Sequence, residues 1–270
     1  MPELPDVETM RRYLERTSLR RRVAEVERVD GYVTRGTRAR ELHEALRGAR
    51  LASTARIGKN LLVRLADGAA RPWLALHFGM TGRLLRLEAG EVPPAETRLL
   101  LRFAGAGGGA LALVDRRRLG RVALADSPGG FADSRRLGPD ALDPALTEEA
   151  FLRLLERRRG RVKAALMDQS LVAGIGNVYS DEILFQARIA PLERLARMSA
   201  PRRRRLYRAL REVLRAAVEA EGDPARMPEG WLLRRRREGE PCPGRCAGTV
   251  ERVKLGGRSA YWCPRCQKAG

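Results

Sequence analysis

Long hydrophobic runs are missing from this chain of 270 residues. None of its apolar stretches reaches the ~20 residues that a membrane-spanning helix requires. The N-terminus also lacks a basic stretch followed by an apolar one, which is the pattern of a secretion signal. We therefore expect the protein to remain in the cytoplasm, where it is made. Its hydrophobic fraction of 44% is sufficient for one large domain or two ordinary ones.

Acidic residues are too few to balance the basic ones, so the formal net charge is +20 and the sequence pI is about 11.2. A surplus of this size disfavours self-association and favours polyanions. Nucleic acid is the expected partner, because the release of counterions from phosphates dominates such affinities. A membrane surface would call for a basic amphipathic helix with a Trp or Phe face, which we do not find. We expect a monomer that binds nucleic acid and no membrane.

Lysine is scarce as well, since only four of the 53 basic residues are lysines and the other 49 (53 − 4) are arginines. This bias is typical of a GC-rich genome. A compact ammonium and a planar guanidinium are not interchangeable, so a lysine that persists can mark a site that needs an ammonium. Lys59, Lys163 and Lys254 are such candidates, whereas chance explains Lys268 near the end of the chain.

Cysteine is absent from the first 241 residues and then occurs four times, as Cys242, Cys246, Cys263 and Cys266. A structural disulfide framework is more often spread along a chain. Two close pairs, C-x3-C and C-x2-C with sixteen residues between them, are the spacing that suits a tetrahedral Zn²⁺ ion. One structural zinc ion is therefore the expected cofactor, with two disulfides or a redox pair as the alternatives.

Periodicity predicts an α+β fold whose first half is rich in strands. Residues 6–19 are expected to form a helix, because Val7, Met10 and Leu14 recur on one face, and residues 38–46 form a shorter one. Short β-like runs separated by turns are typical of an antiparallel sandwich or barrel. These runs are residues 23–29, 51–57, 60–65, 73–78, 82–87, 98–103, 110–114 and 122–124.

The composition changes near residue 126, where Gly, Pro, Ser and Asp become frequent. Helices are expected from Thr147, which with two following glutamates makes a good helix start. Further helices are predicted at residues 162–167, 177–187 and 201–220. The predicted domains are a β-sandwich over residues 1–125, a linker over 126–146, a helical domain over 147–236 and a cysteine-bearing β-hairpin over 237–270.

The first eight residues, Met1-Pro2-Glu3-Leu4-Pro5-Asp6-Val7-Glu8, suggest chemistry. Removal of Met1 would make Pro2 a terminal secondary amine with a pKa of roughly 8, so that a useful fraction is unprotonated at neutral pH. Such an amine can attack an aldehyde-like carbon and form an iminium, which acts as an electron sink. Glu3 is next to it and can handle protons. The alternative is an ordinary disordered terminus that contains prolines.

Three further segments follow this one: His77-Phe78-Gly79-Met80-Thr81-Gly82, Gly174-Ile175-Gly176-Asn177-Val178-Tyr179, and the four-cysteine hairpin. Their order along nearly the whole chain resembles that of the formamidopyrimidine-DNA glycosylase and endonuclease VIII family of base-excision repair enzymes. The resemblance is closer to formamidopyrimidine-DNA glycosylase. The N-terminal motif and the Gly-x-Gly-Asn-x-Tyr segment are specific together, whereas the cysteine pattern alone is generic.

The resemblance implies an N-terminal β-sandwich with flanking helices, then a helix-two-turn-helix domain with a zinc-binding hairpin. It implies a bacterial, nucleoid-associated enzyme that acts on double-stranded DNA containing damaged bases or abasic sites. Pro2 would attack C1′ of the damaged nucleotide, displace the base and form a Schiff base. The strand would then be cleaved by β- and δ-elimination, with Glu3 as acid and base at the sugar.

The same resemblance implies a set of residues that contact DNA. Lys59 matches a catalytic-site lysine that contacts phosphate beside the lesion, although a solvated lysine at a strand end is the alternative. Asn177 and Arg258 match phosphate contacts; a helix N-terminus binds phosphate well, and a simple N-cap is the other role for Asn177. Lys163 resembles a lysine near the lesion pocket, and His77 belongs to the same DNA-binding set.

Flipping a base out of the helix leaves a gap that must be filled. Met80 and Arg117 match two of the residues that fill it, with Arg117 opposite the orphaned base; core packing is the alternative for Met80. The third position holds Leu119 where the family has Phe. Leucine can still wedge between bases.

Three other departures concern the motifs and the loop. Asp6 replaces the usual Glu, and the first cysteine pair has one extra residue. The segment 222–242 is shorter than in family members that recognise 8-oxoguanine. This short segment argues for ring-opened purines, oxidised pyrimidines or abasic sites as substrates, whereas the family-like loops of Met80 and Arg117 favour oxidised purines. The expected function is a bifunctional glycosylase and AP lyase that favours oxidised or ring-opened purines. The alternatives are an oxidised-pyrimidine or abasic-site enzyme, a non-catalytic protein that binds damaged DNA, and a zinc-ribbon module fused to an unrelated β domain.

Overall fold

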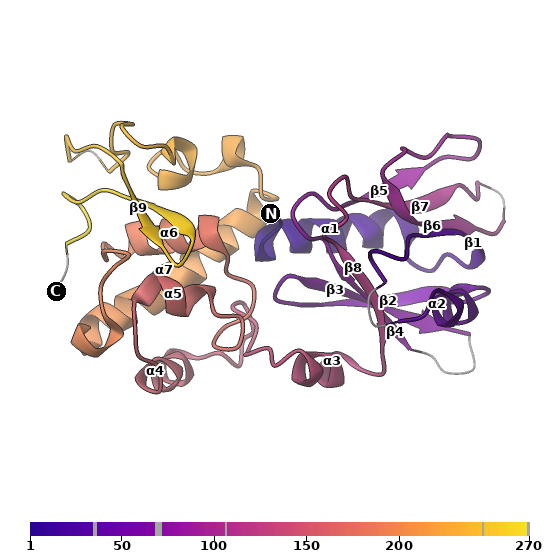
Figure 1. Ribbon diagram of the computed structural model, residues 1–270, viewed down its shortest axis with the longest axis horizontal. Helices are drawn as coiled ribbons and strands as arrows, with labels where there is room; N and C mark the ends of the chain where they lie inside the picture. The colour runs from indigo at the N-terminus through magenta and orange to yellow at the C-terminus, as the bar shows by residue number, and fades with distance from the viewer. Residues whose placement is uncertain (35–36, 68–71, 106, 245, 269–270) are drawn as a thin grey trace. The chain divides into compact units, whose positions relative to one another are not determined.

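The computed structural model describes residues 1–34, 37–67, 72–105, 107–244 and 246–268 (Figure 1). Its contacts divide the chain into two compact units. We call Met1–Pro2 with Asp6–Arg135 the N-terminal unit, and Glu3–Pro5 with Arg136–Gly270 the C-terminal unit. Strands dominate the first and helices the second, which confirms the predicted α+β class. No helix among the described residues is both long and apolar enough to cross a membrane.

Two four-stranded antiparallel sheets form the body of the N-terminal unit, and their eight strands coincide with the eight β-like runs of the sequence to within about one residue. The first sheet has the order β2–β3–β4–β8, with bounds Arg50–Ile57, Asn60–Ala66, Trp73–His77 and Arg121–Ala125. The second has the order β1–β6–β7–β5, with bounds Val23–Val29, Thr97–Phe103, Ala110–Val114 and Arg83–Leu87.

The core of the N-terminal unit is built from the inward side chains of both sheets together with helices α1 (Leu4–Ser18) and α2 (Ala39–Leu46). The predicted apolar face of α1 is confirmed, because Val7 and Leu14 are fully buried. Side chains alternate along a strand, so Leu99 and Leu101 of β6 enter this core while Leu100 joins a second cluster. Each fully buried leucine or valine stabilises the fold by ~1.5–3 kcal/mol.

The C-terminal unit contains helices α4 (Glu148–Glu156), α5 (Val162–Met167), α6 (Asn177–Gln186) and α7 (Ala200–Glu219), three short 3₁₀ helices and one β-hairpin. The 3₁₀ helices are η1 (Leu195–Arg197), η2 (Pro224–Arg226) and η3 (Leu232–Arg235). The hairpin pairs β9 (Glu251–Leu255) with β10 (Arg258–Trp262), and it lies beside α6 (Figure 1).

Sequence signals account for these elements. The apolar face predicted for α7 is buried, with Leu206, Leu210 and Leu214 at zero exposure. The predicted helix start at Thr147 is confirmed, since its hydroxyl accepts the N–H of Ala150 at 3.2 Å. The hairpin turns at two glycines of positive φ, as a two-residue turn demands.

One helix was not predicted. The segment 126–146 was expected to be a linker, yet α3 spans Pro128–Ser134 within it. The hydroxyl of Ser127 accepts the N–H of Gly130 at 3.0 Å, and the proline stands in the first turn, where its missing N–H costs nothing. Burial of Phe131 ties the helix to its unit. The Ser-Pro start was the available signal, and two glycines in the helix obscured it.

Candidate functional site

Glu3 is held by the first turn of α6. Glu3 is 2% exposed, and its carboxylate accepts three backbone N–H groups. These come from Gly176 at 2.7 Å, Val178 at 2.8 Å and Tyr179 at 3.2 Å. A helix N-terminus offers unpaired N–H groups and a favourable dipole to an anion. The structure therefore joins two motifs that are about 170 residues apart in the sequence. It also fixes the side chain of Glu3, the residue that directly follows Pro2.

The two glycines of the Gly-x-Gly-Asn-x-Tyr segment make this approach feasible. A Cβ at Gly176 would lie 2.3 Å from Cδ of Glu3, and one at Gly174 would lie 2.6 Å from Cδ1 of Leu4. Gly174 also has a φ of +115°, which disfavours other residues. Its carbonyl accepts the N–H of Leu4 at 3.0 Å. The segment is thus shaped to receive residues 3 and 4, a role that the sequence did not reveal.

Asn177 is the first residue of α6 and not its cap. Gly176 occupies the N-cap position and offers no side-chain cap, so the alternative of a simple N-cap for Asn177 is wrong. The Oδ1 atom of Asn177 is buried and has no hydrogen-bond partner within the described part of the chain. Buried polar atoms are rarely left unpaired. The amide group therefore has hydrogen-bonding capacity that the fold itself does not use.

Lys163 of α5 is fully buried. Its ammonium forms an ion pair with Asp181 and donates to the carbonyl of Asn177 at 3.2 Å. Burial lowers the pKa of Lys163, although the charge and hydrogen bond of Asp181 oppose that shift. No surface of this ammonium is open to a phosphate in this structure, so a direct contact of Lys163 with DNA stays a prediction.

Lys59 directly precedes β3, and His77 is the last residue of the neighbouring strand β4. Lys59 stands in the tight turn between β2 and β3, after Gly58 with a φ of +57°, and only 9% of it is exposed. The next residue, Asn60, pairs with His77 at the end of β4. Burial and then the charges of Lys59, Arg121 and Arg135 lower the pKa of His77 to about 4, so the ring is neutral at pH 7. Its Nδ1 accepts the N–H of Gly79 at 3.1 Å, which leaves Nε2 as the donor.

Met80, Arg117 and Leu119 are exposed on two loops that the buried carboxylate of Asp115 holds together. Met80 is 41% exposed, so core packing, the alternative for it, is wrong, and Leu119 is 45% exposed. Asp115 accepts the hydroxyl of Thr81 at 2.6 Å and the N–H of Arg117 at 3.2 Å. Burial raises its pKa, but these hydrogen bonds outweigh burial and lower it.

A glycine permits the two loops to touch. A Cβ at Gly79 would lie 2.4 Å from the carbonyl carbon of Leu119. The N–H of Gly120 also donates to Asp115, at 2.7 Å. Sequence reasoning found the three exposed side chains but missed the carboxylate that organises them; its sequence signal was an Asp directly before three arginines.

The four cysteines converge at one point in the C-terminal unit, where their sulfur atoms all lie within 4.8 Å of one another. Two of the distances are 3.6 Å, between Cys242 and Cys266, and 3.5 Å, between Cys246 and Cys263. A disulfide requires ~2.05 Å, so the disulfide alternative is wrong. A tetrahedron with Zn–S bonds of ~2.3 Å has edges of ~3.8 Å, and four thiolates are a donor set that Zn²⁺ prefers. The residues present therefore fit one structural zinc ion.

The metal site is anchored to the rest of its unit by Gln267. Its Oε1 accepts the N–H of Cys263 at 2.8 Å, and its Nε2 donates to the carbonyl of Ile189 at 2.9 Å. The hairpin that rises from this site presents Arg258 in an exposed position at the start of β10. The zinc ion would therefore act by holding the hairpin that carries Arg258.

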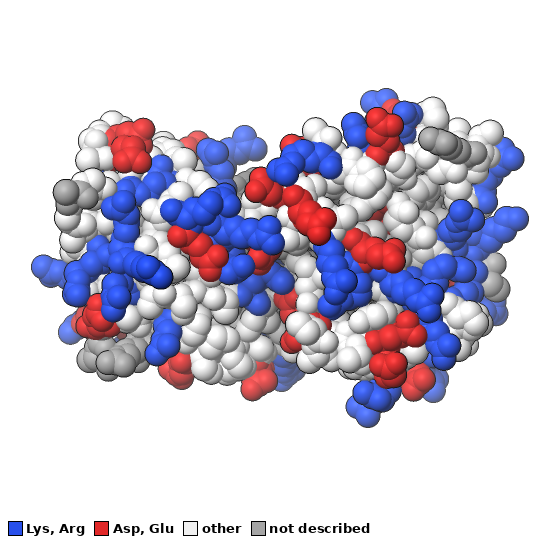
Figure 2. Space-filling model, turned by 180° about the vertical axis from the view of Figure 1, so that it is seen from behind, with Lys and Arg blue, Asp and Glu red and all other residues white. Residues whose placement is uncertain are grey.

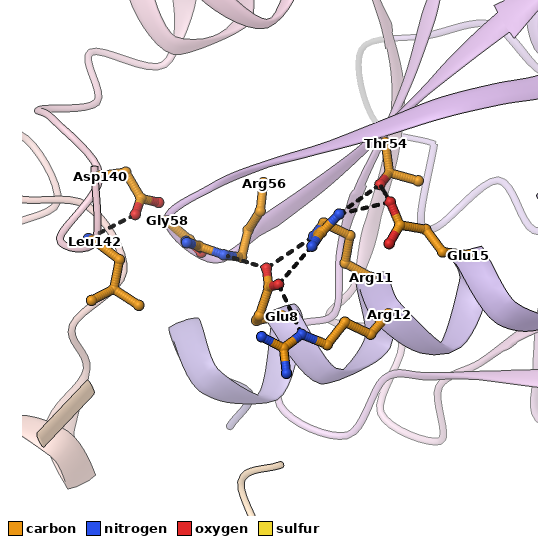
Figure 3. A network of polar contacts seen from close by, with 9 residues as sticks. All are labelled: Glu8, Arg11, Arg12, Glu15, Thr54, Arg56, Gly58, Asp140 and Leu142. Carbon is orange, nitrogen blue, oxygen red and sulfur yellow. Dashed lines mark hydrogen bonds and ion pairs between the residues drawn. The ribbon is translucent and has the colours of Figure 1, made fainter. Parts of the chain in front are cut away.

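Glu8, in the N-terminal motif, is the centre of a charged network between α1 and β2 (Figure 3). Its carboxylate accepts Nη2 of Arg11 at 2.7 Å, Nε of Arg12 at 3.2 Å and Nε of Arg56 at 3.1 Å. Burial raises the pKa of Glu8, but the hydrogen bond and charge of Arg11 and then of Arg56 outweigh burial and lower it. Arg56 precedes Lys59 by three residues, so Glu8 fixes the strand that leads to that lysine.

Figure 2 shows one face of the molecule, on which basic side chains are numerous and acidic ones lie among them. Many of the arginines are already paired on the surface, such as Arg40 with Glu44 at 2.7 Å. Exposed pairs of this kind contribute little to stability. The excess of basic over acidic residues is nevertheless large, which favours a polyanion as partner.

Comparison with known proteins covers the whole chain. Residues 1–122 match the model of the formamidopyrimidine-DNA glycosylase N-terminal domain, residues 137–228 its H2TH domain, and residues 239–269 the zinc finger found in FPG and IleRS. The chain is 39% identical to formamidopyrimidine-DNA glycosylase of Thermus thermophilus over 285 residues, with 100% of both chains covered. It is 38% identical to that of Pelotomaculum thermopropionicum over 281 residues, with 99% of both covered.

Solved structures that are similar to this chain belong to the same family. A crystal structure of Lactococcus lactis formamidopyrimidine-DNA glycosylase, bound non-covalently to DNA with an AP site, matches with a TM-score of 0.87 and 26% identity. The match covers 98% of this chain and 99% of the other. The complex of the Lactococcus enzyme with DNA containing FAPY-dG also has a TM-score of 0.87, at 27% identity, and covers 98% and 100%. The resemblance found in the motifs therefore extends to sequence and fold throughout, and the chain belongs to the formamidopyrimidine-DNA glycosylase family.

Proposed function

We propose that this chain is a bifunctional DNA glycosylase and AP lyase of base-excision repair. The observation that carries the proposal is the Glu3 carboxylate, fixed by three N–H groups at the start of α6. It is joined directly to a proline that becomes a terminal secondary amine once Met1 is removed. A nucleophile and a positioned acid/base group on adjacent residues are what displacement at a sugar carbon requires.

The reaction then follows from the chemistry of a secondary amine. The nitrogen of Pro2 attacks C1′ of the damaged nucleotide, and the bond from C1′ to the base breaks as the base leaves with a proton. The sugar ring opens to an iminium between Pro2 and C1′. Loss of a proton from C2′ supplies the electrons that expel the 3′ phosphate, and a second elimination expels the 5′ phosphate. Glu3 is the group placed to hold and return the protons at the sugar.

The DNA contacts are proposed from the chemistry of the side chains and from the motifs that the chain shares with the family. Arg258, which is exposed and cationic, suits a phosphate, and the side-chain N–H₂ of Asn177 can donate to one. His77, neutral and with Nε2 free to donate, suits a phosphate oxygen without adding charge. Lys59 is proposed as the phosphate contact beside the lesion, in the catalytic set with Pro2 and Glu3.

Met80, Arg117 and Leu119 are proposed to enter the gap that the flipped nucleotide leaves. Their exposure on two loops that are tied together through Asp115 supports a rigid wedge. A rigid wedge loses little conformational freedom when it binds. Arg117 faces the orphaned base in this proposal, and Met80 and Leu119 fill the space beside it.

The preferred substrates are proposed to be oxidised or ring-opened purines. A second preference, for oxidised pyrimidines or abasic sites, is favoured by residues 222–242. Seven residues of this short segment form η2 and η3, and the N–H of Leu233 is bonded to the buried Glu182 at 2.7 Å. These residues are engaged within the fold and do not form a loop that could close over a base. The charge of +20 also supports nucleoid association in the cytoplasm.

Sodium borohydride tests the proposal, because it reduces an iminium to a stable amine and cross-links enzyme to DNA. The purified chain should cross-link to a duplex with an abasic site, and Pro2→Gly should lose most of the cross-link while still binding the duplex. A non-catalytic protein would bind without any cross-link. A panel of duplexes with 8-oxoguanine, ring-opened guanine, thymine glycol, dihydrouracil and an abasic site then separates the substrate preferences.

A further inference from the structure

Asp181 is a fully buried carboxylate in the second turn of α6 that the proposed chemistry does not use. Three separate segments of the C-terminal unit converge on it. Its Oδ1 pairs with the ammonium of Lys163, from α5. Its Oδ2 accepts Nε and Nη2 of Arg236, which follows η3, at 2.9 and 2.8 Å. The backbone N–H of Tyr261, in β10, donates to the same oxygen at 3.2 Å.

The bond from Tyr261 reaches the edge of the zinc hairpin. Within the described residues the sheet of the hairpin consists of β9 and β10, so every second N–H of β10 points away from β9 and has no partner in that sheet. Asp181 supplies that partner from α6. The guanidinium of Arg236 also lies over the ring of Tyr261, 4.7 Å from its centroid. Tyr261 is therefore held from its backbone and from its side chain by the same charged group of residues.

The same two cations hold the start of α6. Lys163 donates to the carbonyl of Asn177 at 3.2 Å, and Arg236 does so at 3.4 Å. Asp181 thus orients two cations that each grip the first residue of α6, while it binds β10 directly. Two cations buried beside a single carboxylate are costly unless each is well paired. Any arrangement that leaves one of these charges unpaired is therefore disfavoured, so the positions of Asp181, Lys163 and Arg236 relative to one another are tightly constrained.

We propose that Asp181 is a positioning residue that locks the zinc hairpin to the N-terminal end of α6. Arg258 lies three residues before Tyr261 on β10, ~10 Å along the strand, so the lock sets where Arg258 stands relative to Asn177. The two residues would then meet successive phosphates as one rigid unit. This inference rests on the proposed function only for the role of Arg258 and Asn177 in binding DNA.

The test compares Asp181→Asn with the matched control Asp223→Asn, which alters an exposed carboxylate of the same unit that caps η2. Hydrogen exchange at the amide of Tyr261 needs no DNA. It should become at least about tenfold faster in Asp181→Asn, as expected for the loss of a charged hydrogen bond, and stay unchanged in the control. Zinc content should remain at one ion per chain. Unchanged exchange at Tyr261 would overturn the inference.

A double-mutant cycle tests the consequence for Arg258. Affinity for a duplex with a tetrahydrofuran abasic-site analogue should fall about tenfold in Asp181→Asn, and much less when Arg258→Ala is already present. A positioning residue gives this non-additive result, whereas general destabilisation lowers affinity equally in both backgrounds and would contradict the inference. If Asp181→Asn does not fold, Arg236→Met keeps the packing over Tyr261 and should show the same non-additivity with Arg258→Ala.

The outcome is separable from that of the proposed function. If the wild-type chain gives no borohydride cross-link but exchange at Tyr261 responds to Asp181→Asn, the proposed lyase fails and the lock stands. If the wild-type chain cross-links and exchange at Tyr261 does not respond, the lock fails and the lyase stands.

Discussion

Replacing Glu8 by Gln tests whether the charged network of α1 and β2 holds the N-terminal unit together. The side chain of Glu8 is 11% exposed, and that of Arg56 is 10% exposed. Glutamine keeps the shape but removes the charge, and its amide N–H₂ cannot accept from an arginine. Arg11 retains Glu15 at 2.7 Å, whereas Arg56 loses the negative charge of Glu8, which its Nε contacts at 3.1 Å.

Breaking one side of a buried charge pair costs about 3 kcal/mol. At ~1.4 kcal/mol per factor of ten, this is more than a hundredfold in the opening equilibrium. Hydrogen exchange measured by mass spectrometry on peptides from α1 and β2 should therefore accelerate by about that factor. Hydrogen exchange in peptides from the C-terminal unit should accelerate far less. A similar acceleration there would indicate global unfolding and not a local effect of Glu8.

The control is Glu44→Gln, the same substitution in a surface pair of the N-terminal unit. Glu44 accepts from Arg40 at 2.7 Å, but both side chains are largely exposed. Such a pair contributes little, so exchange should stay as in the wild type. Equal exchange rates in Glu8→Gln and Glu44→Gln would refute the reasoning.

The pH dependence of the same variants gives an independent check. The folded chain lowers the pKa of Glu8 below its ordinary value of 4.5. The stabilisation is therefore fully present above that value and is lost as the pH falls through the folded pKa. The difference in stability between wild type and Glu8→Gln should be constant from pH 8 to about pH 5 and should shrink at lower pH.

Cys263→Ser should release the metal and weaken binding to abasic-site DNA while the N-terminal unit keeps its structure, as shown by metal analysis, titration and circular dichroism; loss of all secondary structure would argue against separate units. Glu3→Gln should reduce base excision far more than cleavage at a preformed abasic site in single-turnover assays, and equal losses would contradict the role given to Glu3. His77→Asn should remove part of the decline in stability as the pH falls from ~6.5 to 4, because the pKa of folded His77 is about 4 and the unfolded chain takes up the proton first. Glu182→Gln should raise stability at pH 8 more than at pH 5, because burial raises the pKa of Glu182 to about 7 and its ionisation above that pH opposes folding; denaturant titrations at both pH values decide.

Much of the fold was predictable because local patterns and tertiary packing agree. The stripe of Val7 and Leu14 could be buried only on one face of a helix, and α1 buries it. The glycine pair at the tip of the zinc hairpin permits the tight turn that the structure contains. The division into four domains stays a prediction.

The remainder depended on contacts between distant residues, which periodicity does not reveal. The sequence indicates that Gly176 starts a helix. It does not reveal that a glycine is needed there because the side chain of Glu3 occupies the space that a Cβ would fill. A lysine in a short helix is ordinarily expected to be exposed. Lys163 is buried instead, because it pairs with Asp181, which lies 18 residues later in the sequence. Asp115 appears as one acid in an arginine-rich loop, and only the fold shows which donors it gathers.

The covalent step is tested most directly by locating the trapped bond. After reduction of the complex with abasic-site DNA, peptide mass spectrometry should place the modified sugar on the amine of Pro2, in a chain whose mass lacks Met1. An adduct on Lys59 or another side-chain amine, or undiminished strand cleavage by a chain that still carries Met1, would contradict the account.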